Sequence, residues 1–125
     1  MTENEVAKQI VDVAFKTHTA FGPGLLESVY ETIMAYELQK RGLQVRRQQP
    51  IPVVHEGIRM DLGFRADLIV ENKVVVEVKS IEAIAPVHKK QVLTYLRITN
   101  KKLGLLITFN VELIKNGISR IVNGL

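Results

Sequence analysis

Three charged residues in the middle of the chain have types and spacing that suit metal-dependent chemistry. Glu77 and Lys79 lie two apart in the run Val74–Lys79, in which all the remaining residues are valine. Side chains two apart in a strand point to the same face, and charges inside an apolar strand are costly unless they are paired or bind a ligand. Asp67 precedes Glu77 by ten residues. These three side chains therefore need a common explanation.

The length of the turn before this strand decides whether Asp67 joins Glu77. With a three-residue loop at 71–73, Asp67 faces Glu77 and their Cβ atoms lie about 4.5–5.5 Å apart. Carboxylates that close repel each other, and Mg²⁺ or Mn²⁺ between them makes the arrangement favourable. With a two-residue loop, Asp67 faces Val78 and the carboxylates point to different faces. A plainer alternative makes Glu77 and Lys79 an ordinary ion pair at a strand end, with Asp67 closing a turn.

Three further side chains are candidates for the same site. Glu27 lies at the border of the apolar side of a predicted helix, within reach of the sheet as a further acidic ligand. As a first-turn glutamate it also suits the positive end of the helix dipole. Gln91 and Tyr95 are four apart on a later helix and share a face, where Gln91 would hydrogen-bond a phosphate or a metal-bound water. Otherwise Gln91 is an ordinary half-buried amide.

Seven elements are expected to position these residues. Hydrophobic periodicity and turn signals predict helices at 3–19 and 25–41, strands at 45–55, 58–70 and 74–79, a helix at 86–99 and a strand at 103–109. The apolar side of the second helix is marked by Leu26, Val29, Tyr30, Ile33 and Leu38. Pro50 and Pro52 predict that the first strand is an edge strand or an irregular strand. The apolar strand 74–79 is typical of burial on both faces. This order predicts one α/β domain over residues 1–125, with a central mixed sheet flanked by helices. Residues 111–125 stay ambiguous.

Composition narrows the class of protein. The chain has 125 residues, 46% of them apolar, with no Cys and a formal net charge of +4. These values fit one globular domain and exclude a disulfide scaffold or a Cys-ligated metal centre. No apolar run approaches the roughly 20 residues of a membrane span, and the polar N-terminus is unlike a secretory signal, so a cytoplasmic protein without a membrane partner is expected. The positive charge fits a nucleic-acid partner. Its basic pairs are Lys40-Arg41, Arg46-Arg47, Lys89-Lys90 and Lys101-Lys102.

The sequence resembles the PD-(D/E)XK nuclease superfamily in Asp67, followed after nine residues by Glu77-Val78-Lys79. More narrowly, the segment GLLESVY at Gly24–Tyr30 resembles the signature of the GxxExxY proteins, a branch of that superfamily. The stretches RADLIVENKVVVEVKS, QVLTYL and LGLLITF resemble the rest of this branch. The resemblance covers nearly the whole chain.

The resemblance implies a restriction-endonuclease-like αβββαβ core and metal-dependent cleavage of phosphodiester bonds in DNA or RNA. Asp67 and Glu77 would be ligands of Mg²⁺ or Mn²⁺, and the carbonyl of Val78 would be a third ligand. Lys79 would orient the attacking water or help to deprotonate it.

The resemblance also assigns roles to the other candidates. Glu27 would match the helix-borne acid, as a ligand or a catalytic group, and Gln91 and Tyr95 match the Q-x-x-x-Y element of exonuclease-like branches. The leading proline of the superfamily motif is replaced by Ala66. A catalytically silent nucleic-acid-binding or protein-interaction module with the nuclease fold is the alternative, and a structural protein with an ion-pair network is a third. A chain of 125 residues has little room for a separate recognition domain, so a homodimer or a partner is expected to supply specificity.

Overall fold

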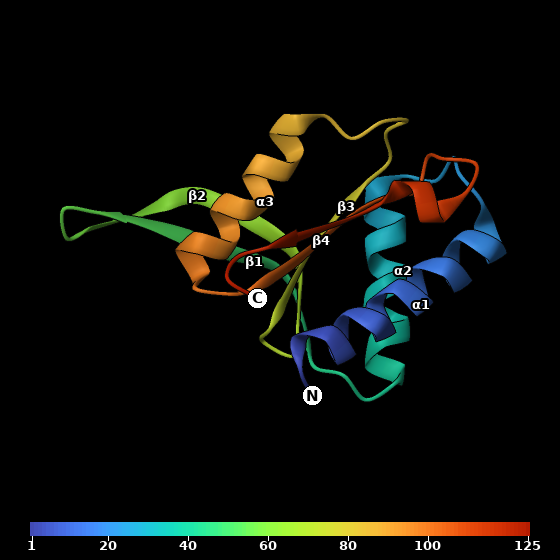
Figure 1. The fold of residues 1–125 in the computed structure, drawn as a ribbon, viewed down its shortest axis with the longest axis horizontal. Coiled ribbons are helices and arrows are strands. Elements are labelled where there is room, and N and C mark those ends of the chain that lie inside the picture. Colours follow the sequence, from blue (N-terminus) through green and yellow to red (C-terminus); the bar gives the residue numbers. More distant parts are fainter.

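Three helices surround a five-stranded sheet in the computed structural model (Figure 1), which describes residues 1–125 apart from the side chains of residues 61 and 62. The elements are α1 (Glu3–Phe21), α2 (Glu27–Lys40), β1 (Val45–His55), β2 (Ile58–Val70), β3 (Val74–Lys79), α3 (Pro86–Thr99), β4 (Leu103–Thr108), the 3₁₀ turn η1 (Ile114–Gly117) and β5 (Ile118–Val122). No helix in the described part of the chain is long and apolar enough to cross a membrane.

The sheet is mixed and runs in the order β1-β2-β3-β4-β5. Strands β3 and β4 are parallel and are joined through α3, whereas the other neighbouring pairs are antiparallel. The predicted α/β class with a central mixed sheet is confirmed, and β1 lies at an edge as its prolines indicate. The ambiguous segment 111–125 contributes η1 and an edge strand, β5.

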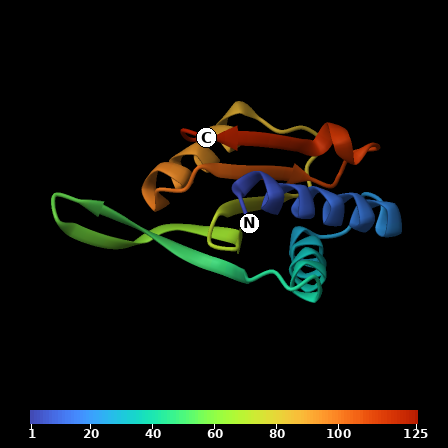
Figure 2. The same ribbon diagram turned by 60° about the horizontal axis from the view of Figure 1, so that its bottom comes forward.

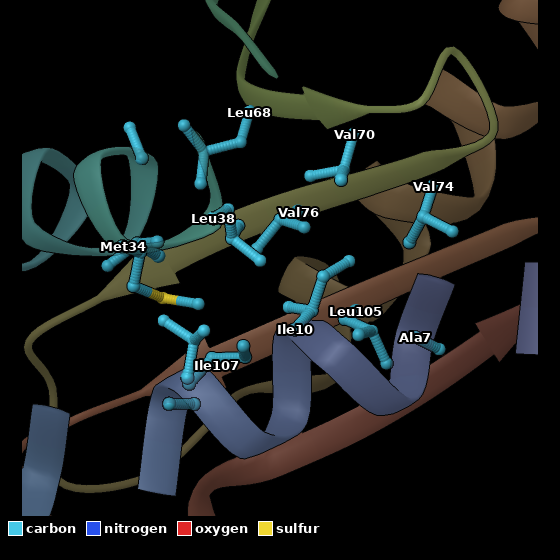
Figure 3. Packing of buried hydrophobic residues seen from close by; sticks show 14 of the residues in the cluster. Ala7, Ile10, Met34, Leu38, Leu68, Val70, Val74, Val76, Leu105 and Ile107 are labelled. Atoms are coloured by element: carbon cyan, nitrogen blue, oxygen red, sulfur yellow. The ribbon is translucent and has the colours of Figure 1, made fainter. Parts of the chain in front are cut away.

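Apolar side chains are buried on both faces of the sheet. Leu68, Val76 and Leu105 belong to the cluster that packs under α1 and α2 (Figure 3). Ile69 and Val75 belong to a second cluster, formed with the apolar side of α3. Because both faces are covered, β3 is apolar at nearly every position, as expected for a buried parallel strand.

Beyond the sheet, β1 and β2 continue as a two-stranded arm (Figure 1, Figure 2). These strands pair from Val45↔Val70 out to His55↔Ile58, whereas the recorded β2–β3 pairs begin at Val70 and end at Leu68. Asp67 is therefore the first residue of β2 beyond the ladder with β3, and it lies at the base of the arm.

Candidate metal and catalytic site

The β2–β3 turn has the length on which the metal hypothesis depends. Val70 pairs with Val74, so three residues form the turn. The same register, continued by one row past the last recorded pair, sets Asp67 beside Glu77 rather than Val78. The three-residue loop predicted from the sequence is confirmed. The Glu77 side chain lies on the same face of β3 as Val75, two residues earlier, and this is the face that α3 covers.

The two carboxylates meet where β2 and β3 separate. The Asp67 N–H donates to Glu77 Oε1 at 3.2 Å, and the Val78 N–H donates to Asp67 Oδ2 at 2.8 Å. Side-chain oxygens thus bind backbone N–H groups just beyond the strand ladder. The N–H and C=O of one residue point to the same edge of a strand, so the Val78 carbonyl also faces this gap.

Glu77 is a buried acid beside a second acid. The residue is only 6% exposed to solvent. Burial, and then the negative charge of Asp67, raise the pKa of Glu77 to about 9, although the positive charge of Lys79 acts in the opposite direction. Glu77 therefore retains a proton at neutral pH unless a positive charge binds beside it.

Lys79 is half-buried and lies on the same face of β3 as Glu77. Ion pairs among the described residues join Arg41 to Asp12, Arg47 to Glu31 and His55 to Glu56. The Glu77–Lys79 ion pair of the plainer alternative is not among them. The ammonium is thus near enough to influence the Glu77 carboxyl without being bound to it.

Helix α3 brings Tyr95 to the acids and leaves Gln91 in solvent. Tyr95 is buried against Phe64, with ring centroids 4.8 Å apart. Burial, and then the charges of Glu77 and Asp67, raise the pKa of the Tyr95 hydroxyl. Gln91 lies one turn earlier and is exposed rather than half-buried, and its side chain has no hydrogen bond to any described residue.

A cavity of about 840 Å³ opens beside Asp67. Its lining includes Glu27, Glu31, Gln48 and Ser80. Glu27 thus shares a cavity with Asp67, but its Oε1 accepts the Ser80 N–H at 3.1 Å. The cavity joins the first turn of α2 to Asp67 of β2 and to Ser80, the residue directly after β3.

An acid that the sequence reasoning missed, Glu31, occupies the inner wall of this cavity. Its Oε2 accepts Arg47 Nη2 at 3.0 Å, and its Oε1 accepts Gln48 Nε2 at 2.5 Å. The same Gln48 Nε2 lies 3.3 Å from Asp67 Oδ1. Glu31 therefore holds the amide that contacts the candidate ligand.

The predicted apolar side of α2 is confirmed at Tyr30 and Leu38 but was wrong at Leu26 and Val29, and this error hid Glu31. Leu26 is 72% exposed, and Val29 is also exposed. The buried side of the helix contains Glu31, Met34 and Leu38. Counted from Glu31, the buried positions follow the spacing i, i+3, i+4 and i+7, and this pattern was the available signal.

Removal of this acid tests the network. Glu31→Ala is expected to lower the free energy of unfolding by about 1–3 kcal/mol, because Arg47 and Gln48 lose their acceptor. It should also weaken divalent-cation binding, since Gln48 no longer holds Asp67. Urea unfolding and calorimetric titration with Mg²⁺ measure the two effects. Glu112→Ala, which removes an exposed glutamate, is the matched control; equal results for the two variants would contradict the network.

The donor set fits a hard cation that shares its coordination with water and substrate. Asp67 and Glu77 supply carboxylate oxygens, and the Val78 carbonyl lies on the same edge. Within the described residues, no three His, Cys, Asp or Glu side chains group to hold an ion. Mg²⁺ is commonly held by one or two carboxylates, with waters and substrate phosphates completing its shell.

A family model described as the PD-(D/E)XK nuclease superfamily matches residues 4–121. No curated protein and no solved structure matches the chain. The matched segment includes every candidate residue of the site.

Proposed function

The chain belongs to the PD-(D/E)XK nuclease superfamily, and we propose that it is a metal-dependent nuclease that hydrolyses phosphodiester bonds of DNA or RNA. One observation carries the proposal. Asp67 and Glu77 meet where β2 separates from β3, with Lys79 on the same strand face as Glu77. Glu77, the buried acid of this pair, retains a proton at neutral pH and is poised to exchange it for a cation.

The proposed cofactor is Mg²⁺, with Mn²⁺ as a substitute. Asp67, Glu77 and the Val78 carbonyl would hold it. When bound, the cation supplies positive charge that lowers the pKa of the attacking water and offsets the charge that builds on the phosphate.

The chain's own groups would supply the remaining chemistry. Lys79 Nζ would hold the attacking water or a phosphate oxygen beside the acid pair. Glu27 uses Oε1 for the Ser80 N–H, so Oε2 is the oxygen with which it would act as the auxiliary acid. The Tyr95 hydroxyl, near both acids, would orient them, and the exposed Gln91 would contact the phosphate backbone.

We further propose a place in the GxxExxY branch and a cytoplasmic location. The branch proposal is supported by Gly24, Glu27 and Tyr30, which form one structural unit at the start of α2. Gly24 has a φ of 109°, in the region that favours glycine. Glu27 and Tyr30 both bind groups of the loop or strand beside it.

The direct test is cleavage. We expect the purified protein to degrade at least one of single-stranded DNA, double-stranded DNA and RNA in Mg²⁺ or Mn²⁺, and none in EDTA. Asp67→Asn, purified in parallel, controls for contaminating nucleases and should be inactive. Binding without cleavage in any cation would favour the catalytically silent module instead.

Lys89-Lys90 is the basic pair best placed to hold the nucleic acid. Both side chains are exposed at the start of α3, with no partner among the described residues. In contrast, Arg41, Arg47 and Lys101 bind other side chains.

Charge removal at this pair has a specific signature. We expect the double variant Lys89→Ala/Lys90→Ala to weaken nucleic-acid binding about equally for all sequences. The slope of log affinity against log salt should fall by about 1–2, because each lost phosphate contact releases one counterion fewer. Fluorescence anisotropy over a salt series measures it. Lys102→Ala, at the far end of the sheet, should leave the slope unchanged; an unchanged slope in the double variant would remove α3 from the interface.

A further inference from the structure

The backbone at the end of β3 is held by contacts from two sides. On one side, the Lys79 carbonyl accepts the Phe109 N–H at 3.0 Å. On the other, Ser80 Oγ donates to the Leu25 carbonyl at 2.9 Å, and the Ser80 N–H donates to Glu27 Oε1 at 3.1 Å. Lys79 and Ser80 are thus tied both to the segment after β4 and to the entry of α2.

Tyr30 completes a closed circuit of contacts. Its hydroxyl donates to the Gly22 carbonyl at 2.5 Å and accepts the Leu25 N–H at 3.1 Å. Its buried aromatic ring stacks on Phe109, with centroids 4.2 Å apart and planes inclined by 7°. Starting at Lys79, this circuit of contacts therefore runs through Ser80, Leu25, Tyr30 and Phe109 and returns to Lys79.

The circuit of contacts lies where β3 extends beyond its ladder with β2. The recorded β2–β3 ladder ends at Val76, so the last residues of β3 pair in register only with β4. On the β2 side, the end of β3 is held at Val78 by the Asp67 side chain rather than by a ladder of paired backbone groups. Leu25 and Glu27 contact it there, through Ser80.

The loop before α2 is shaped for this contact. Gly22 and Gly24 have φ values of 65° and 109°, which a residue with a side chain rarely adopts. Tyr30 then fixes the loop through both Gly22 and Leu25. Substitutions at either glycine would move the Leu25 and Glu27 oxygens that accept hydrogen bonds from Ser80.

We infer that Tyr30 and Ser80 are positioning residues, which fix Lys79 relative to the Asp67–Glu77 pair through a clamp formed by Gly22, Leu25, Glu27, Tyr30, Ser80 and Phe109. The inference rests on the proposed nuclease function, because it assigns the clamp a purpose in that reaction. It also gives the pattern Gly24-x-x-Glu27-x-x-Tyr30 a physical meaning. Glycine permits the loop, Glu27 binds the strand end and Tyr30 binds the loop.

The experiment measures the position of Lys79 directly. Mn²⁺ added to the protein carrying isotope-labelled lysine broadens the Lys79 side-chain resonance according to its distance from the ion. We expect this broadening to fall at least twofold in Ser80→Ala and Tyr30→Phe. Amide exchange at Leu25 and Ser80 should accelerate at least about tenfold, because their hydrogen bonds are lost or loosened. Calorimetry should show cation affinity within about twofold of wild type, since the ligands remain.

Catalysis supplies the functional readout. The rate constant kcat should fall about ten- to a hundredfold at nearly constant KM, as expected for a misplaced group. Ser80→Thr retains the hydroxyl and should restore both kcat and the broadening. Tyr36→Phe, at an exposed tyrosine on the same helix, should match wild type in every measurement.

The outcomes separate the two proposals. Unchanged Mn²⁺ broadening of Lys79 in Ser80→Ala and Tyr30→Phe would overturn the positioning role, whatever the activity. Changed broadening with wild-type kcat would reduce the clamp to a structural feature and also overturn it. If the broadening changes in the two variants but the wild-type protein cleaves no nucleic acid, the nuclease function is refuted. The positioning of Lys79 by the clamp then still stands.

Discussion

Lys79→Ala is expected to lower the rate of phosphodiester cleavage about a hundredfold or more, with the fold and cation binding retained. Lys79 is half-buried on the same strand face as Glu77, and its ammonium is the group proposed to hold the water or stabilise the phosphate charge. Both carboxylates remain in the variant. Single-turnover cleavage, with melting temperature as the check on folding, measures the effect.

Cation affinity in the same variant should depend on pH. Loss of the Lys79 charge removes repulsion against a cation, which tightens binding. That charge also lowers the pKa of Glu77, so its loss makes Glu77 hold its proton more firmly. The two effects oppose each other at pH 7, and the tightening should dominate above pH 9, where Glu77 is ionised. Calorimetry at both pH values tests this sign.

Lys102→Ala is the matched control, because it removes an exposed lysine at the opposite end of the neighbouring strand. It should cleave at the wild-type rate. If Lys79→Ala also cleaves at that rate, the proposed role of Lys79 is wrong, and if it only lowers the melting temperature, the residue is structural.

Local patterns were sufficient to predict the pairing of the acids. A valine-rich strand interrupted by Glu77 and Lys79 indicates burial on both faces. The ten-residue spacing from Asp67 then leaves only the turn length to decide. Turn signals at Glu71-Asn72-Lys73 favoured three residues, and the register agrees. Contacts between neighbouring strands are local in sequence, so the pattern could specify them.

Contacts from distant segments were not predictable in this way. Gln48 comes opposite Asp67 through the β1–β2 pairing, and it has a left-handed φ of 48° that strand periodicity does not indicate. Glu31 reaches Gln48 only because α2 turns a different side toward the sheet than the leucine and valine positions indicated. Likewise, Glu27 meets Ser80 through the path of a glycine-bearing loop. Each of these depends on tertiary packing, which overrides helical periodicity and propensity.

Without a bound cation, the stability of the protein is expected to fall as pH rises from about 5 to 9. The pKa of Glu77 is raised from 4.5 in a free carboxyl to about 9 in the fold, so the folded state binds a proton that the unfolded state releases. The stabilisation is fully present below pH 4.5 and is lost as pH rises to about 9. The decline has an upper limit of about 1.4 kcal/mol per pH unit, the value for one proton.

Glu77→Gln should remove this decline, because the amide resembles the protonated acid in size and in hydrogen bonding. Urea unfolding in EDTA at several pH values compares the slopes of the two proteins. Glu82→Gln, an exposed glutamate outside the site, should keep the wild-type slope. Wild type and Glu77→Gln share every other titrating group, and Glu82→Gln controls for the loss of one carboxyl, so a difference in slope belongs to Glu77.

Mg²⁺ then distinguishes an acid pair that binds a cation from one that is only strained. At pH 8, saturating Mg²⁺ should raise the melting temperature of wild type and of Glu82→Gln, since a ligand that binds only the folded state stabilises it by about 2.7 kcal/mol at a hundred times its Kd. Glu77→Gln has lost one of the two anionic ligands, so it should gain no stability and should not cleave nucleic acid. A parallel decline in all three proteins would contradict the raised pKa of Glu77. An equal gain from Mg²⁺ in all three would contradict a cation site that uses the Glu77 carboxylate.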